Sequence, residues 1–147
     1  MPKTLGRIIL FGLLLMLAAT TGPVVALGAA GDVAVTVTYK GKGPVDETRE
    51  VWVFLFDTPD LGPGARPVAT QTVKKNGGTA TFTGVTQSPV YVRIAYDEKG
   101  DYDGFSGPPP PGTPLGQYST DGKTIAPVTP GPGAKIKVVF DDSVRHP

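Results

Sequence analysis

Apolar and polar side chains alternate along three separate stretches of this chain. The stretches are 32–40 (DVAVTVTYK), 90–96 (VYVRIAY) and 134–140 (AKIKVVF), and each places apolar or aromatic residues at every second position. Because successive side chains of a β-strand point to opposite faces, this pattern predicts three strands that each bury one face. No stretch after residue 30 keeps the 3.6-residue period of an amphipathic helix. The sequence therefore predicts an all-β domain.

A fourth stretch, 50–56 (EVWVFLF), is apolar at consecutive positions. A strand of this composition is expected in the interior of a sheet, with both of its faces covered. A weaker strand is expected at 117–118 or within 123–128, where apolar residues are fewer. These segments raise the number of predicted strands beyond the three that alternate.

A turn signal lies between two further predicted strands, 68–73 and 79–82. The segment between them contains Asn76-Gly77, a dipeptide that accepts the positive φ angles of a tight hairpin. The two strands are therefore expected to pair as a hairpin. About seven short antiparallel strands, separated by Gly, Pro, Asn and Asp, are typical of a β-sandwich.

The first 30 residues (1–30) have the composition of an export signal. Lys3 and Arg7 precede an apolar stretch at 8–19, and small residues follow before position 31. This order is typical of a secretory signal peptide, whose apolar part forms a short helix. A transmembrane anchor needs about 20 apolar residues, and this run is shorter. We expect cleavage within 28–30, a secreted or periplasmic location, and one β-sandwich domain at 31–147.

The domain lacks the residues on which several kinds of active site depend. It has no Cys, which excludes disulfides, thiol nucleophiles and Cys-ligated zinc. His146 is the only histidine, on a C-terminal tail that is expected to be mobile and so unsuited to a catalytic triad. Asp101 and Asp103 form a pair of acids, but no apolar stretch surrounds them to raise a pKa. We therefore expect a protein that is not an enzyme.

The charge of the chain also limits its partners. The formal net charge is +1 and becomes −1 once Lys3 and Arg7 are removed with the signal peptide. A nucleic-acid or membrane-surface partner would call for a basic face or stripe, and the sequence shows none. A protein or glycan ligand is expected instead, with membrane contact only through the signal peptide.

Proline and glycine are concentrated between positions 104 and 133. Eight of the 16 prolines lie there, including the run 108–111. Two interpretations remain open for this segment. It could be an extended ligand for a proline-binding partner, or an ordered cover over a sheet face, anchored by Tyr102, Phe105 and Tyr118.

One region resembles a known family. The residues GTATFTGV at 78–85, followed by PVYV at 89–92 and by Asp97, resemble carboxypeptidase regulatory-like domains, which are prealbumin-like sandwiches. Their signature is a glycine, a hairpin ending in phenylalanine, a small loop and then Gly-x-Tyr-x-apolar. Residues 87–89 (QSP) stand where that family usually has Pro-Gly. The resemblance implies a seven-stranded prealbumin-like or immunoglobulin-like sandwich, usually non-catalytic, serving exported proteins as an accessory, adhesive or carbohydrate-associated module.

Acidic residues and glycines follow the predicted strand 90–96 directly. Calcium prefers clustered carboxylate and carbonyl oxygens, and Asp97, Asp101 and Asp103 beside two glycines partly provide them. Lys99, however, stands where an EF-hand loop has a ligand. Two interpretations therefore remain open, an irregular calcium site and a solvated acidic turn in which Lys99 is the counter-charge.

Two other predicted strands also end in an aromatic residue followed by an acid, Asp57 after 50–56 and Asp141 after 134–140. Strands that run in the same direction would bring such acids to one end of the sandwich. Asp57 or Asp141 would then add ligands to a calcium site. The local alternative is that Asp ends strands because its side chain bonds the turn backbone.

The loop aromatics are the best candidates for ligand contact. Tyr102, Phe105 and Tyr118 lie outside the predicted strands, and loops on a rigid sandwich usually carry recognition. Trp52 and Tyr91 lie inside strands and are expected in the core or on a sheet face. The sequence thus predicts an exported, non-catalytic binding or accessory module of unknown ligand. The alternatives are a calcium-stabilised structural or adhesion module and a carbohydrate-binding module.

Overall fold

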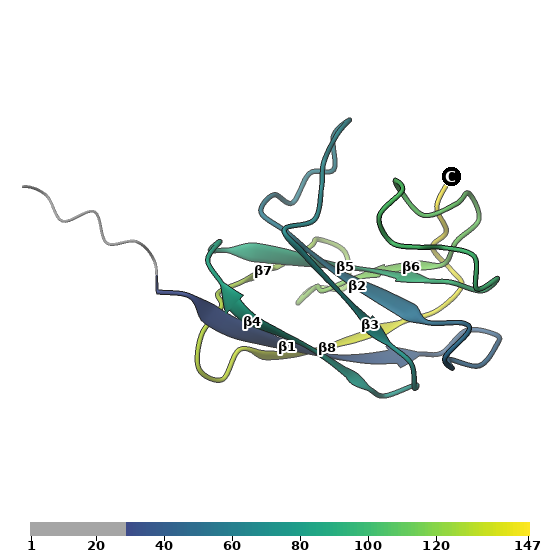
Figure 1. Cartoon of the computed structure of the whole chain (residues 1–147), viewed down its shortest axis with the longest axis horizontal. Helices are drawn as coiled ribbons and strands as arrows, with labels where there is room; N and C mark the ends of the chain where they lie inside the picture. The colour runs from purple at the N-terminus through teal and green to yellow at the C-terminus, as the bar shows by residue number, and fades with distance from the viewer. Residues whose placement is uncertain (1–28) are drawn as a thin grey trace, which may run out of the picture.

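The computed structural model describes residues 29–147, and these form eight strands and no helix. The strands are β1 (Gly31–Tyr39), β2 (Val51–Phe56), β3 (Ala69–Val73), β4 (Thr79–Val85), β5 (Val90–Tyr96), β6 (Leu115–Gln117), β7 (Pro127–Val128) and β8 (Lys135–Phe140) (Figure 1). The predicted signal peptide falls almost entirely on residues 1–28, outside the described part. Within 29–147, no helix long and apolar enough to cross a membrane is found.

The strands form two sheets that lie face to face (Figure 1). One sheet has the order β4-β1-β8, and the other has the order β3-β2-β5-β6 with β7 also paired to β5. The prediction of an all-β protein is confirmed, and the two-layer arrangement is consistent with a β-sandwich. The number of strands is eight, one more than expected.

One strand pair is parallel, which the sequence analysis did not foresee. β1 and β8 run in the same direction, with Ala34 opposite Lys135 and Tyr39 opposite Phe140. All other strand pairs in residues 29–147 are antiparallel. A parallel pair needs a long connection, and the whole chain between β1 and β8 supplies it. Alternation shows which face of a strand is buried, but it says nothing about the direction of the neighbouring strand.

The main core lies between the two sheets and is built from the predicted inward faces. Its members are Val33, Val35, Val37, Tyr39, Val51, Val53, Leu55, Val73, Ala80, Phe82, Val85, Val90, Val92, Ile94, Tyr96, Val128, Val138 and Phe140. Along β1 every second side chain is buried, as the alternation predicted. The outward lysines of β8, Lys135 and Lys137, are exposed. Since β8 is an edge strand, these charges also oppose pairing with another chain.

The predicted hairpin around Asn76-Gly77 is wrong. β3 pairs with β2 and β4 pairs with β1, so the connection crosses from one sheet to the other. The Asn76 side chain forms two hydrogen bonds with the backbone of Tyr39. Its Oδ1 accepts the Tyr39 N–H at 2.8 Å, and its Nδ2 donates to the Tyr39 carbonyl oxygen, also at 2.8 Å. Asn76 has no positive φ, whereas Gly77 has φ 79°. Val73 of β3 and Ala80 and Phe82 of β4 all belong to the main core between the two sheets.

A second, smaller apolar cluster covers the outer face of β2. Phe54 and Phe56 are buried there, with the half-buried Trp52, Tyr102 and Leu115 packed around them together with Ala95. The prediction that β2 is covered on both faces is therefore confirmed. Tyr102 comes from the loop that follows β5, and its ring meets the Trp52 ring edge-on at a centroid distance of 5.5 Å.

The proline-rich segment 104–133 contains β6 and β7 and so is divided by short strands. Its first part contributes to the cover over Trp52, because Phe105 lies edge-on to that ring at 6.0 Å. Tyr118 does not take part in this cover. It packs against the main core on the other side of the sheet. The expected three-residue anchor therefore consists of Tyr102 and Phe105 alone.

Candidate functional site

The loop after β5 is organised by one carboxylate, Asp97. Oδ1 of Asp97 accepts the backbone N–H of Gly100 at 2.8 Å and that of Asp101 at 3.3 Å. Oδ2 accepts the N–H of Tyr102 at 3.0 Å. Asp97 is only 7% exposed, and no other charged or polar side chain in the described part is as buried. A local explanation of this acid is therefore sufficient, since it closes the turn by bonding the backbone.

A second turn follows directly and is closed by Asp103. Its Oδ1 accepts the N–H of Phe105 at 2.9 Å and that of Ser106 at 2.8 Å, and its Oδ2 accepts the Ser106 hydroxyl. These hydrogen bonds favour the ionised carboxylate and lower the pKa of Asp103 to about 2, with the Ser106 side chain as the largest cause. Two consecutive turns thus carry Tyr102 and Phe105 to the outer face of β2.

The residues predicted to bind calcium are only partly brought together. Asp97, Asp101 and Asp103 lie on one loop, but within residues 29–147 no three acidic or histidine side chains are placed to hold a metal ion. Asp57 follows β2, which runs antiparallel to β5, so Asp57 lies at the opposite end of the strands from Asp97. A six-residue strand spans about 20 Å, which excludes Asp57 from this loop. Calcium binding by the loop stays a prediction.

The ends of β5 and β8 do meet at one end of the sandwich. Arg145 joins them, because its Nη1 lies 2.8 Å from Glu98 after β5 and its Nη2 lies 3.5 Å from Asp142 after β8. Asp142 also accepts the Tyr39 hydroxyl, which lowers the pKa of Asp142. Burial and this same bond raise the pKa of Tyr39. The neighbours of two strand-end acids, Glu98 beside Asp97 and Asp142 beside Asp141, therefore meet at Arg145. Asp141 itself closes a local turn, because its Oδ1 accepts the Ser143 N–H at 2.9 Å.

The C-terminal tail that carries His146 is held in place. The His146 N–H donates to Thr113 O at 2.8 Å, and the His146 carbonyl accepts the N–H of Gly112, also at 2.8 Å. Leu115 N–H likewise donates to Val144 O at 2.8 Å. The expectation of a mobile tail is wrong for this segment, because its backbone pairs with residues 112–115.

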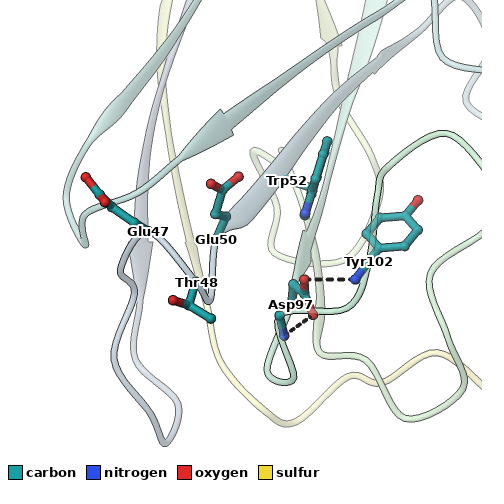
Figure 2. A pocket seen from close by; sticks show the side chains of 7 residues that line it. Glu47, Thr48, Glu50, Trp52, Asp97 and Tyr102 are labelled. Carbon is teal, nitrogen blue, oxygen red and sulfur yellow. Dashed lines mark hydrogen bonds between the residues drawn. The ribbon is translucent and has the colours of Figure 1, made fainter.

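A pocket of about 380 Å³ opens beside the Asp97 loop (Figure 2). It is lined by Glu47, Thr48, Glu50, Trp52, Asp97, Gly100 and Tyr102. The start of β2 provides Trp52, and the segment just before it provides the acids Glu47 and Glu50. The Glu50 carboxylate lies 3.3 Å from the Lys74 ammonium group at the end of β3. The pocket thus joins two segments that are about 50 residues apart in the sequence.

The indole nitrogen of Trp52 is the unusual atom of this pocket. Less than 1 Å² of Nε1 is accessible to solvent, and Nε1 has no hydrogen-bond partner within the described residues. Figure 2 shows Trp52 with this nitrogen on the side that faces Asp97, and Tyr102 with its hydroxyl turned away. That hydroxyl donates to Gly107 O at 3.0 Å. A buried donor without an acceptor is rare in folded proteins and calls for an explanation.

The three aromatic residues predicted to contact a ligand lie in different surroundings in the structure. Tyr102 lines the pocket, Phe105 is 75% exposed beside Trp52, and Tyr118 packs into the main core. Trp52, Glu47, Thr48 and Glu50 were not among the predicted site residues. The available signal was Trp52 on the outward face of an apolar strand, but only the covering loop shows that Trp52 lines a pocket.

Acidification is expected to destabilise the protein between pH 4 and pH 2. Hydrogen bonds lower the pKa values of five carboxylates from 3.8, and these belong to Asp46, Asp103, Asp121, Asp141 and Asp142. Since the unfolded chain binds protons first as the pH falls, the stability these groups contribute is complete above pH 4. It is then lost toward the folded-state pKa, which is about 2 for Asp103. Thermal melts from pH 5 to pH 2 measure the loss.

The matched variant for this prediction is Asp103→Asn, which keeps one oxygen acceptor but cannot ionise. The wild-type protein should melt higher than this variant at pH 5, and the difference should shrink at pH 2. Parallel melting curves over the whole range would contradict the assigned role of the Asp103 charge.

The pocket is lined by polar groups, namely the carboxylates of Glu47, Glu50 and Asp97, a threonine hydroxyl and one indole N–H. Its walls come from β2 and from the loop after β5, both attached to the main core. No protein-family model, curated protein or solved structure matches this chain, so its place among the carboxypeptidase regulatory-like domains stays a prediction.

Proposed function

We propose that this protein is an exported, non-catalytic binding module whose ligand enters the pocket between the start of β2 and the loop after β5. The observation that carries the proposal is the buried, unpaired N–H of Trp52 at the wall of a pocket of about 380 Å³. Concave sites of this size with a few convergent polar groups are typical of small-ligand binding. A ligand that supplies the missing acceptor would stabilise the folded protein.

The walls of the pocket are supported by the fold, which favours recognition. Asp97 holds the Gly100 and Tyr102 wall through its backbone bonds. Trp52 is held by the rings of Phe54, Tyr102 and Phe105. A site whose backbone walls are already formed loses less conformational entropy when it binds.

A binding role fits the carboxylates of the pocket better than catalysis does. A general acid or base needs an available proton site and a pKa adjusted to the reaction. The Asp97 oxygens already accept three backbone N–H groups, and Glu50 is paired with Lys74. Export is the part of the proposal that rests on residues 1–30, where the pattern is typical of a secretory signal peptide.

The proposal is tested by titrating the protein with calcium chloride, neutral sugars, sugar acids, organic ammonium ions and short proline-rich peptides. Trp52 is the only tryptophan of the chain, so intrinsic fluorescence reports on this pocket directly. We expect at least one class to change the Trp52 emission and to raise the melting temperature. A ligand at a hundredfold its dissociation constant stabilises the fold by about 2.7 kcal/mol.

Two threonine variants provide the control. Thr48→Met places a larger side chain in the pocket, while Thr86→Met makes the same change at an exposed position after β4. Thr48→Met should abolish the response and Thr86→Met should preserve it. A response to calcium that survives Thr48→Met would favour the calcium-stabilised module instead. If no class changes either the emission or the melting temperature, the proposed function is wrong.

A further inference from the structure

The pocket has one hydrogen-bond donor that the protein leaves unpaired. An indole N–H donates and cannot accept, so a ligand atom that meets it must be an acceptor. Bulk water barely reaches this nitrogen, since less than 1 Å² of it is accessible. An acceptor therefore reaches Nε1 only when side chains of the pocket wall shift as the ligand binds, and such rotamer changes are common on binding.

The same pocket presents acceptors on its other side. An ionised carboxylate has about four acceptor positions, and the Asp97 side chain uses three of them. Its Oδ2 accepts only the Tyr102 N–H, so it has a position left for a donor. Asp97 lies opposite the indole nitrogen of Trp52 in the close view of the pocket (Figure 2). A ligand group between the two must accept from Trp52 and donate to Asp97.

The charge of the pocket does not demand a cation. Glu50 is compensated by Lys74 at 3.3 Å, and Asp97 is stabilised by its three backbone donors. Glu47 is exposed at the rim. An ammonium group could pair with these acids but has no lone pair for the Trp52 N–H. A carboxylate or phosphate could accept from Trp52 but would be repelled by the acids.

We infer that the pocket binds a hydroxyl group of a neutral sugar, held between the Trp52 indole N–H and the Asp97 carboxylate. This inference rests on the proposed function and names its ligand class. A hydroxyl accepts and donates at one oxygen atom, as this position requires. The volume of about 380 Å³ is at the small end of the range for ligand sites and suits one sugar unit.

Recognition here depends on hydroxyl groups and not on stacking against Trp52. The Trp52 ring already contacts Phe54, Tyr102 and Phe105 at centroid distances of 6.4, 5.5 and 6.0 Å. Gly104 lies against the same ring, where an added methyl group would stand 2.8 Å from Cη2. The ligand therefore meets the N–H edge of the indole. We expect discrimination between sugars that differ in a single hydroxyl group.

The test uses the methyl glycosides of glucose, galactose, mannose, xylose and N-acetylglucosamine, with tetramethylammonium and arginine as cationic probes and acetate as an anionic probe. Because the chain has one tryptophan, the protein labelled with nitrogen-15 has one indole N–H resonance. At least one glycoside should shift this resonance and quench the Trp52 fluorescence. Its deoxy analogue, lacking the bound hydroxyl, loses the hydrogen bonds to both Trp52 and Asp97 and should bind roughly a hundredfold more weakly.

Two variants separate the loss of the indole N–H from the loss of an aromatic hydroxyl elsewhere. Trp52→Phe removes the donor and should weaken sugar binding about tenfold by calorimetry. Tyr118→Phe removes a hydroxyl from a ring that packs against the main core on the other side of the sheet, and it should leave sugar affinity unchanged. If Trp52→Phe does not fold, the indole resonance of the wild-type protein decides alone.

The outcomes distinguish this inference from the proposed function. Binding of tetramethylammonium or arginine without any glycoside would overturn the sugar assignment and leave a binding module. Sugar binding that leaves the indole resonance unmoved would place the ligand elsewhere and overturn the inference. If no probe binds at all, the inference is wrong, and the proposed function is then decided by the calcium and proline-rich peptide titrations described above.

Discussion

Replacing Asp97 by alanine should lower the free energy of unfolding by about 2–4 kcal/mol. The substitution leaves the N–H groups of Gly100, Asp101 and Tyr102 without their acceptor in a loop that packs over Trp52. Each buried donor left unpaired costs about 1–3 kcal/mol, and rearrangement toward water recovers part of this. Urea unfolding monitored by circular dichroism gives the loss directly.

The Asp97→Asn variant separates hydrogen bonding from charge. Asparagine keeps one oxygen for Gly100 and Asp101, but its amide nitrogen then faces the Tyr102 N–H. We expect roughly half the loss of the alanine variant, about 1–2 kcal/mol. The pocket should also change in Asp97→Ala, because Asp97 and the residues that it positions form one wall. A stability close to wild type for Asp97→Ala would show that this carboxylate does not organise the loop.

Replacing Gly104 by alanine should have a comparable or larger effect, about 2–5 kcal/mol. Gly104 is buried with φ 73°, a left-handed conformation that costs other residues about 1–2 kcal/mol. The new methyl group would also stand 2.8 Å from Cη2 of Trp52 and closer still to Cε3 and Cζ3. Overpacking of this kind typically costs about 1–3 kcal/mol. Thermal and urea unfolding measure the total, and a shifted Trp52 emission maximum reports the displaced ring.

Gly122 provides the matched control for this substitution. Its φ is 74°, nearly the same as that of Gly104, but an added methyl group would meet no atom within 4 Å. Gly122→Ala should therefore show only the backbone cost of about 1–2 kcal/mol and no change in Trp52 emission. Equal losses for the two variants would mean that the contact between Gly104 and Trp52 contributes nothing.

The sequence correctly predicted which face of each main strand is buried. In β1, β5 and β8 the alternation identified the inward side chains, because a strand turns successive residues to opposite faces whatever its neighbours are. For β2, apolar residues at consecutive positions indicated a cover on each face, and the structure has the main core on one side and the Trp52 cluster on the other.

The sequence did not correctly predict which strands pair with each other. The Asn76-Gly77 turn indicated a hairpin, but β3 and β4 join different sheets, since Asn76 bonds the end of β1 instead. A dipeptide describes the conformation of a turn and contains no information about which strand lies beside the next one. Tyr118 was grouped with Tyr102 for the same reason, as both are loop aromatics, yet they lie on opposite sides of one sheet.

The candidate site was found in part. The acidic loop was recognised from its sequence, and its local alternative, an aspartate that closes a turn, describes Asp97 as the structure has it. The role of Trp52 was not foreseen, because nothing in the strand 51–56 indicates that the start of β2 borders the loop after β5. That proximity comes from the antiparallel register that sets Val51 opposite Tyr96.

By itself, the sequence determined that this protein is all-β, which faces of its strands are buried, and where its acidic and proline-rich loops lie. These properties follow from the period of the side chains and from turn residues, which act over a few positions of the chain. Only the tertiary structure decided the parallel pairing of β1 with β8, the separation of Asp57 from Asp97, and the pocket that joins Glu50 and Trp52 to Asp97. Strand order depends on the total surface that all the strands bury together, and a pattern within a few residues carries no information about that total.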